Sequence, residues 1–203
     1  MPYSCRRLGS EMIRVHGFKN DSSERKKSLV MSLNPEELPG RGWAMLGERI
    51  YRSGSIGPDG DRAKRSRQAG GVAVWRSFEL DAPHRGLWSQ VAPYASADDA
   101  ESAVPILLSI AEKNPSFVGR VVEERKNDEL TIANVNHLYA VERITVENRG
   151  GAGGTKYVVG SIDRIIFVVA CSQYGDGWEW SEVASVAELQ ARKIFEASFS
   201  KGS

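Results

Sequence analysis

The chain has 203 residues, of which 41% are hydrophobic and 26% charged, and this composition is typical of a globular protein rather than a disordered one. The 27 Lys and Arg nearly balance the 26 Asp and Glu, so the net charge of +1 predicts no global attraction to nucleic acid or anionic lipid. Two cysteines and three histidines exclude a disulfide framework and a structural zinc site, and they favour a reducing, cytoplasmic location. The apolar runs are also shorter than the roughly 20 residues of a membrane-spanning helix.

Residues 1–38 are predicted to form a flexible basic arm. Up to Met31 they hold seven basic and three acidic residues without a sustained periodicity. Met31 is an alternative start of the native protein, in which case residues 1–30 would be an extension. A proline-rich passage then predicts the entry to a single domain, residues 39–203.

Two strands are predicted in the first part of this domain. Trp43–Tyr51 is the candidate first strand, and Val72–Leu80 alternates apolar with polar residues like a half-buried strand. The glycine-rich loop 52–71 between them contains a basic cluster, namely Arg62, Lys64, Arg65 and Arg67.

The basic loop has two interpretations. With help from Arg25, Lys26 and Lys27 it could hold phosphates, while Tyr51 and Trp75 stack on bases. The alternative is a solvated loop, which the near-zero net charge favours, so we do not expect nucleic acid as the partner.

The middle of the chain predicts one helix. The segment Pro83–Pro93 is interpreted as a connection, and Ser96–Asp99 resembles a capping box that begins the helix. Pro105 should kink or split this helix, because proline lacks the backbone donor. A strand is expected afterwards at Val118–Glu124.

The following stretch predicts an antiparallel ribbon. Leu138–Asn148 alternates as a strand, a glycine loop follows at 150–154, and the ribbon ends in the apolar run Ile165–Cys171. Such a run predicts a central strand with both faces covered. A phosphate-binding loop has Gly-Lys followed by Ser or Thr, and it begins a helix. Here Thr155 precedes Lys156 and a strand follows, so the glycines are interpreted as a hairpin loop.

The last element is a predicted amphipathic helix, Ser181–Phe199. Together these patterns predict an α+β fold, with an antiparallel sheet of about five to six strands packed against two main helices. The long C-terminal helix should cover the sheet.

Three polar residue types invite a catalytic interpretation. Cys171 could act as a nucleophile with His137 as the base, and with Asp163 or Glu142 as the orienting carboxylate. The alternative is that Cys171 is a small buried hydrophobe at the end of a strand and that His137 is a packed or surface residue. Nothing in the spacing implies a cofactor or a metal.

Two tryptophans precede the last helix. Trp178 and Trp180 flank Glu179 beside Tyr174, and they either anchor the helix by packing or form an exposed binding patch. An extended junction would point one of the pair inward.

The run 157–171 and the helix at 181–194 resemble the final hairpin and helix of PsbP-like α+β domains. The pattern is similar in particular to the extracellular sensor domains of bacterial Ser/Thr kinases and related lipoproteins, over roughly residues 70–199, and Ser96–Ala100 resembles their helix entry. The resemblance implies a binding or sensing role with no catalytic residues to carry over. Because the sequence shows no signal-peptide core, lipobox cysteine or paired cysteines of the kind expected outside the cell, we do not expect this chain to share the exported location of that group.

Three functions therefore stand as hypotheses. The first is a non-enzymatic domain that binds a small molecule or a protein, through Trp178, Trp180, Tyr174, Cys171 and His137. The second is a small cytosolic enzyme that uses Cys171. The third is a nucleic-acid accessory protein that uses the basic loop.

Overall fold

The computed structural model describes residues 22–52, 71–81, 84–112, 120–146, 152–173 and 177–199. The strands are β1 (Ala44–Arg52), β2 (Val72–Leu80), β3 (Arg85–Pro93), β4 (Arg120–Lys126), β5 (Asn136–Val146), β6 (Ala152–Ile162) and β7 (Ile165–Gln173). The helices are α1 (Ser22–Met31), the short 3-10 helix η1 (Pro35–Glu37), α3 (Ala97–Glu112) and α4 (Trp180–Phe199).

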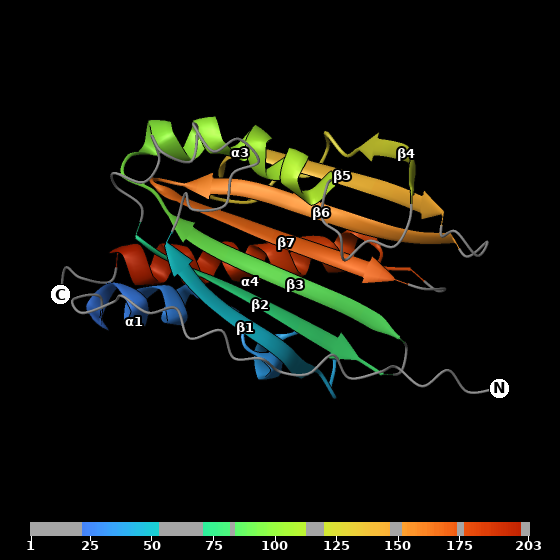
Figure 1. Ribbon diagram of the computed structural model, residues 1–203, viewed down its shortest axis with the longest axis horizontal. Helices are drawn as coiled ribbons and strands as arrows, with labels where there is room; N and C mark the ends of the chain where they lie inside the picture. The colour runs from blue at the N-terminus through green and yellow to red at the C-terminus, as the bar shows by residue number, and fades with distance from the viewer. Residues whose placement is uncertain are drawn as a thin grey trace.

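The described strands form one open antiparallel sheet in the order β1-β2-β3-β7-β6-β5-β4 (Figure 1). Strand β7 lies at the centre, where it pairs with β3 on one side and with β6 on the other. Helix α3 carries the chain from β3 to β4 at the far edge. The predicted α+β class is confirmed, with seven strands in place of the expected five to six.

The additional strand is β3, which lies where the sequence predicted a connection. In this strand buried Leu87, Ser89 and Val91 alternate with half-buried residues. Proline lies near each end of the segment, and this favoured the interpretation as a connection. Its backbone pairs with β2 on one side and with β7 on the other, so tertiary pairing overrides the local signal of the prolines.

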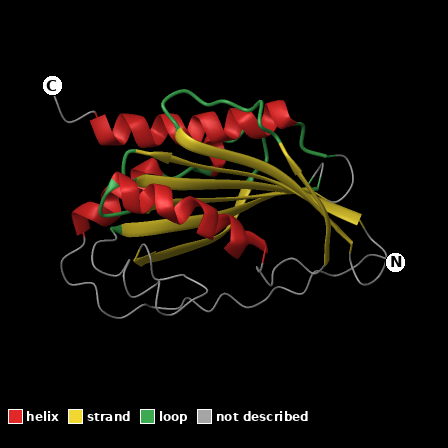
Figure 2. Cartoon of the chain, turned by 90° about the horizontal axis from the view of Figure 1, so that it is seen from above, coloured by secondary structure: helices red, strands yellow, loops and turns green. Residues whose placement is uncertain are grey.

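The apolar run of β7 packs on both faces of the sheet, as predicted. Phe167, Val169 and Cys171 belong to the core beneath α4, whereas Ile166 and Val168 belong to a second core beneath α3. Figure 2 shows α4 and α3 on opposite sides of the sheet. We refer to these as the α4 side and the α3 side.

Residues 22–38 are part of the packed structure, in contrast to the predicted arm, while residues 1–21 lie outside the described residues. Met31 and Leu33 are fully buried in the core on the α4 side. Ser28 donates its hydroxyl to the carbonyl of Val72 at 2.6 Å, which attaches α1 to β2. The sequence did not predict this helix, because the apolar periodicity of α1 is weak. The burial of the segment comes from contacts with residues distant in the chain.

Two further expectations differ from the structure. Pro105 lies within α3, which continues through it as one helix, so the predicted split does not occur. The glycine loop expected at 150–154 is shorter, because Gly153 and Gly154 pair with β5 as part of β6. Residues 147–151 lie outside the described residues.

Candidate functional site

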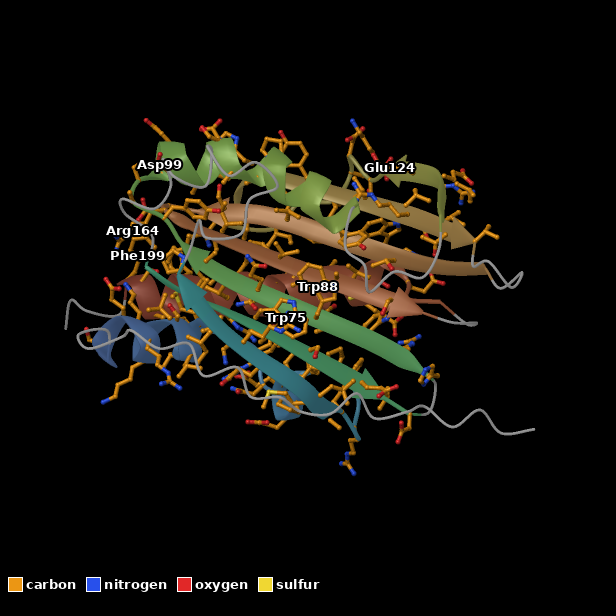
Figure 3. All side chains as sticks on the ribbon, viewed as in Figure 1. Trp75, Trp88, Asp99, Glu124, Arg164 and Phe199 are labelled. Carbon is orange, nitrogen blue, oxygen red and sulfur yellow. The ribbon has the colours of Figure 1, made fainter. Side chains whose placement is uncertain are left out.

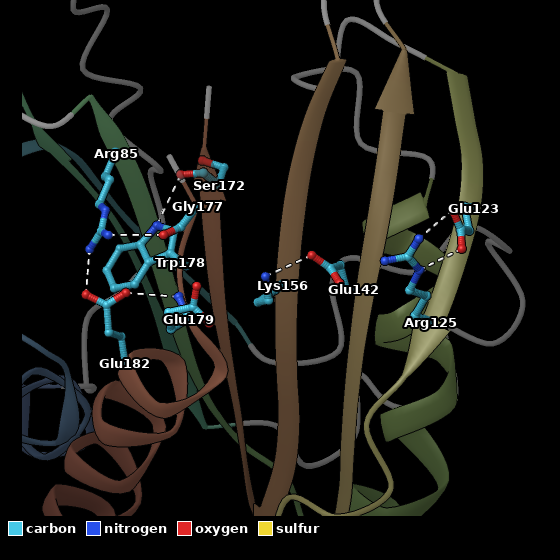
Figure 4. A network of polar contacts seen from close by, with 10 residues as sticks. All are labelled: Arg85, Glu123, Arg125, Glu142, Lys156, Ser172, Gly177, Trp178, Glu179 and Glu182. Atoms are coloured by element: carbon cyan, nitrogen blue, oxygen red, sulfur yellow. Dashed lines mark hydrogen bonds and ion pairs between the residues drawn. The ribbon is translucent and has the colours of Figure 1, made fainter. Parts of the chain in front are cut away.

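Trp178 anchors the start of α4 to the sheet. Its side chain is 1% exposed, and its indole Nε1 donates to the carbonyl of Ser172 at 3.2 Å (Figure 4). One neighbour is Trp43, whose ring stacks at 5.8 Å between centroids, and another is the Arg85 guanidinium at 4.9 Å from the ring centre. This geometry is that of a packing residue, and it meets the expectation that one tryptophan of the pair points inward.

An ion pair holds the same corner. Arg85 donates from Nη1 to Glu182 Oε1 at 2.8 Å and from Nη2 to the carbonyl of Gly177 at 3.1 Å. Glu182 also accepts from the backbone N–H of Glu179, at 2.9 Å, which satisfies a free donor at the helix start. The hydrogen bond from Arg85, and then that from Glu179, lower the pKa of Glu182. These contacts orient α4 on β3.

Cys171 lies beneath this corner as a neutral thiol. Its side chain is buried, and burial raises its pKa, with the nearby Glu182 carboxylate adding to the increase. The strand register pairs Cys171 with Lys156, near one end of the sheet. The opposite end holds His137, which lies 3.2 Å from Glu101 of α3. The structure therefore does not bring the predicted thiol and histidine together.

Trp180 covers a second ion pair on the α4 side. Lys156 lies with Nζ 5.7 Å from the Trp180 ring centre and donates to Glu142 Oε1 at 2.8 Å. The two charged side chains are only 11% and 17% exposed, while Trp180 is half-buried. Of the predicted binding residues, Trp178, Trp180 and Cys171 thus share one corner. Tyr174 and the basic loop of Arg62, Lys64, Arg65 and Arg67 lie outside the described residues.

The α3 side carries a row of aromatic and cationic side chains that crosses the sheet. From β1 to β5 the row contains Arg49, Trp75, Trp88, Tyr157 and Arg143, all on that side by the strand register. Figure 3 shows Trp75 and Trp88 side by side on neighbouring strands. Tyr157 and Arg143 are almost completely buried and cannot contact a ligand. We call the three remaining residues, Arg49, Trp75 and Trp88, the aromatic face.

The buried end of the row is a closed polar cluster. Arg143 is 3% exposed, donates from Nε to Glu124 Oε2 at 2.8 Å, and lies 5.3 Å from the Tyr157 ring centre. Burial raises the pKa of Tyr157 to about 12, although Arg143 acts in the opposite direction. The rings of Trp88 and Tyr157 meet in an edge-to-face arrangement, at 6.3 Å between centroids. The cluster supports Trp88 from one side.

The open end of the row is Arg49 on Trp75. Arg49 is exposed, and its guanidinium lies 5.4 Å from the Trp75 ring centre. Trp75 and Trp88 are both half-buried. Sequence reasoning placed Trp75 on the correct strand, but it missed Trp88, which lies inside the segment interpreted as a connection. A period-two pattern at Leu87, Ser89 and Val91 was the available signal.

The described residues contain neither a metal-binding cluster nor a membrane-spanning helix. No group of three or more His, Cys, Asp or Glu side chains is arranged to hold a metal ion there. Within the same part of the chain, no helix combines the length and the apolar character needed to cross a membrane.

The comparisons with known proteins concern the fold. No protein-family model matches the sequence, and no curated protein matches it. The structure is similar to the crystal structure of the extracellular domain of PknH from Mycobacterium tuberculosis, with a TM-score of 0.52 and 10% identity. The similarity covers 88% of this chain and 98% of that chain. It supports, at the level of the fold alone, the resemblance to kinase sensor domains that the strand and helix pattern indicated.

Proposed function

We propose that this chain is a non-enzymatic ligand-binding domain and that its ligand contacts the aromatic face. The observation that carries the proposal is the pair of half-buried tryptophans on neighbouring strands, Trp75 and Trp88. Binding sites are lined mainly by aromatic and apolar side chains with a few polar groups that orient the ligand. Ser77 and Gln90, also half-buried, are the cross-strand partners of Trp88 and Trp75 on the same side of the sheet and supply such groups.

The fold agrees with a binding role. The similar structure is an extracellular domain, and in the group that the sequence resembles such domains are sensors rather than enzymes. The similarity does not identify a ligand, so the site is argued from the side chains of this chain. The cytoplasmic location that the cysteine usage predicts stays a prediction.

We assign no nucleophilic role to Cys171. A thiolate, and not a thiol, is the reactive form of cysteine, and burial favours the protonated form of this side chain. We also propose no nucleic-acid partner, because the net charge is +1.

The corner at Trp180 is a second candidate contact surface. The half-buried indole of Trp180 and the pair Lys156–Glu142 offer apolar and charged groups side by side. Because the charges of Lys156 and Glu142 neutralise each other, we expect this corner to attract a charged ligand less strongly than Arg49 does.

Binding at the aromatic face can be tested with a neutral aromatic probe, (2-naphthyl)acetamide. The indole N–H resonances of the five tryptophans report on binding in a two-dimensional NMR titration. We expect the probe to shift the signals of Trp75 and Trp88, and Trp88→Ser to weaken binding.

Trp180→Ser is the matched control, since it removes another half-buried indole, from the other side of the sheet. The proposal fails if the probe leaves the Trp75 and Trp88 signals in place, or if it shifts the Trp180 signal instead.

A further inference from the structure

The ring of Trp75 reaches over the edge strand β1. A Cβ atom on Gly47 would lie 3.7 Å from Cζ3 of Trp75 and 3.4 Å from Oγ of Ser77, so the ring covers a position of β1 that has no side chain. Trp88 is the partner of Ser77 on β3, and its ring meets Tyr157 in an edge-to-face arrangement. The two indoles are therefore separate contact points, one at the edge of the sheet and one nearer its centre.

Two charged side chains of opposite sign border these indoles. Arg49 is exposed, and its guanidinium lies 5.4 Å from the Trp75 ring centre. Glu79 is half-buried and follows Trp75 by four residues on β2, so it lies on the same side of the sheet. It is diagonal to Trp88, and Nδ1 of His84 lies 3.6 Å from its Oε1. The face thus has a positive end at Arg49 and a negative end at Glu79.

The spacing of these two charges matches an extended polypeptide. Arg49 is the cross-strand partner of Trp75, and Glu79 lies four residues further along β2, which is about 13 Å at the rise of a strand. In an extended segment, residues i, i+2 and i+4 share one face and span the same length. Charged side chains at i and i+4 would reach the two ends, and residue i+2 would lie above Ser77, next to both tryptophans.

The place and composition of this surface are those of a protein interface. Helix α3 packs on β6 and β7, and the aromatic face lies beside it on the same side of β1, β2 and β3. Tryptophan and arginine are enriched among the residues that contribute most to binding between proteins. Charges of both signs around such residues favour a partner with the complementary pattern.

We infer that the ligand of the aromatic face is a polypeptide segment with an acidic, an apolar and a basic residue at positions i, i+2 and i+4. The acidic side chain pairs with Arg49 and the basic side chain with Glu79. The apolar side chain packs on Trp75 and Trp88. Because an extended segment can lie on a sheet in either direction, the pattern is read in either order. The inference rests on the proposed function and adds the class of partner.

The test compares acetylated and amidated peptides without tryptophan, in NMR titrations of the whole chain followed at the indole N–H signals. Two peptides have opposite charges, Thr-Glu-Thr-Leu-Thr-Lys-Thr and its reverse. Two others have Glu at both charged positions or Lys at both. We expect one opposite-charge peptide to shift the Trp75 and Trp88 signals and to bind about tenfold more tightly than either like-charge peptide, because each of these replaces an attractive contact with a repulsive one.

Two further measurements separate spacing and charge from composition. Thr-Thr-Glu-Lys-Leu-Thr-Thr has the same composition as the opposite-charge peptides, but its adjacent charges lie on opposite sides of an extended chain. It should bind no more tightly than the like-charge peptides. The preference for opposite charges should fall as NaCl is added, because salt screens exposed charges.

Charge variants of the protein should change the preference in a defined direction. Arg49→Glu makes both ends of the face negative, so the peptide with two Lys should bind most tightly. Glu79→Gln should make the opposite-charge peptide and the peptide with two Glu bind about equally. Arg192→Glu is the control, because it makes the same change of charge at an exposed residue of α4, on the other side of the sheet (Figure 2). This variant should keep the original preference.

The outcomes distinguish the inference from the proposed function. If (2-naphthyl)acetamide shifts the Trp75 and Trp88 signals and the peptides do not, the inference is overturned and the proposed function stands. Peptide binding without a charge preference, or a preference that Arg49→Glu leaves unchanged, also overturns it. Signals of these tryptophans that move with protein concentration alone would assign the face to a second copy of the chain and overturn it as well. If neither the peptides nor the naphthyl probe bind, both proposals fail.

Discussion

Gln190 of α4 donates a hydrogen bond from Nε2 to the backbone carbonyl of Met31, at 2.6 Å and across 159 positions of the chain. Both residues are fully buried. The bond satisfies a carbonyl at the end of α1, where no turn of helix follows to supply a donor. It therefore joins the first and last described helices on the α4 side.

Replacing Gln190 should destabilise the fold. Gln190→Leu keeps a similar volume but leaves the Met31 carbonyl buried without this donor, so we expect a loss of about 1–3 kcal/mol in the free energy of unfolding. Urea denaturation followed by circular dichroism measures the change. Glu188→Gln, on the exposed side of α4, should alter stability little, and an equal loss in both variants would contradict the role of this bond.

Deletion of α1 should expose the core on the α4 side. A chain that begins at Met31 lacks Ser28, whose hydroxyl donates to the Val72 carbonyl, and it lacks the helix that precedes Met31. We expect a lower melting temperature for this deletion than for removal of residues 1–21, which leaves α1 intact. Equal melting temperatures for the two deletions would show that α1 does not contribute to stability.

The Arg85–Glu182 pair should make stability depend on pH. The pKa of Glu182 is lowered in the folded protein, so the pair contributes stability above the unfolded pKa of about 4.3 and loses it as the pH falls through the folded value. Arg85→Gln should lose about 1 kcal/mol at pH 7, since Glu182 is partly exposed.

This loss should shrink near pH 3. The measurement is urea denaturation of both proteins at the two pH values, with Arg41→Gln as the control for the removal of one positive charge. A loss of the same size at both pH values would show that Arg85 stabilises the corner through Trp178 and the Gly177 carbonyl and not through Glu182.

Cys171 should be unreactive while the protein is folded. Burial raises its pKa and shields the sulfur, so iodoacetamide at pH 8 should label it only after unfolding in urea. A Cys5→Ser variant leaves Cys171 as the single thiol and makes mass spectrometry of the product unambiguous. Rapid labelling of the folded variant would contradict the buried, neutral thiol.

Local periodicity predicted the elements whose signal lies within their own sequence. Val72–Leu80 matches β2 at both ends, and the predicted helix Ser181–Phe199 differs from α4 by one residue. The apolar run at 165–171 is the central strand, as predicted, because neither of its faces could be left in water. β3 and α1 were missed because distant pairing and packing stabilise them against a weak local pattern.

The same division applies to the candidate site. Sequence alone indicated that Trp75 lies on a half-buried strand, since alternation along one strand is a local property. It could not place Trp88 beside Trp75, or Arg49 on the Trp75 ring.

Those positions depend on register, which is determined by pairing between strands separated by loops of any length. A shift of one residue would move Trp88 to the α4 side. The sequence by itself therefore determined the fold class, the central strand and the last helix. Only the tertiary structure, through strand register, decided which side chains share the aromatic face.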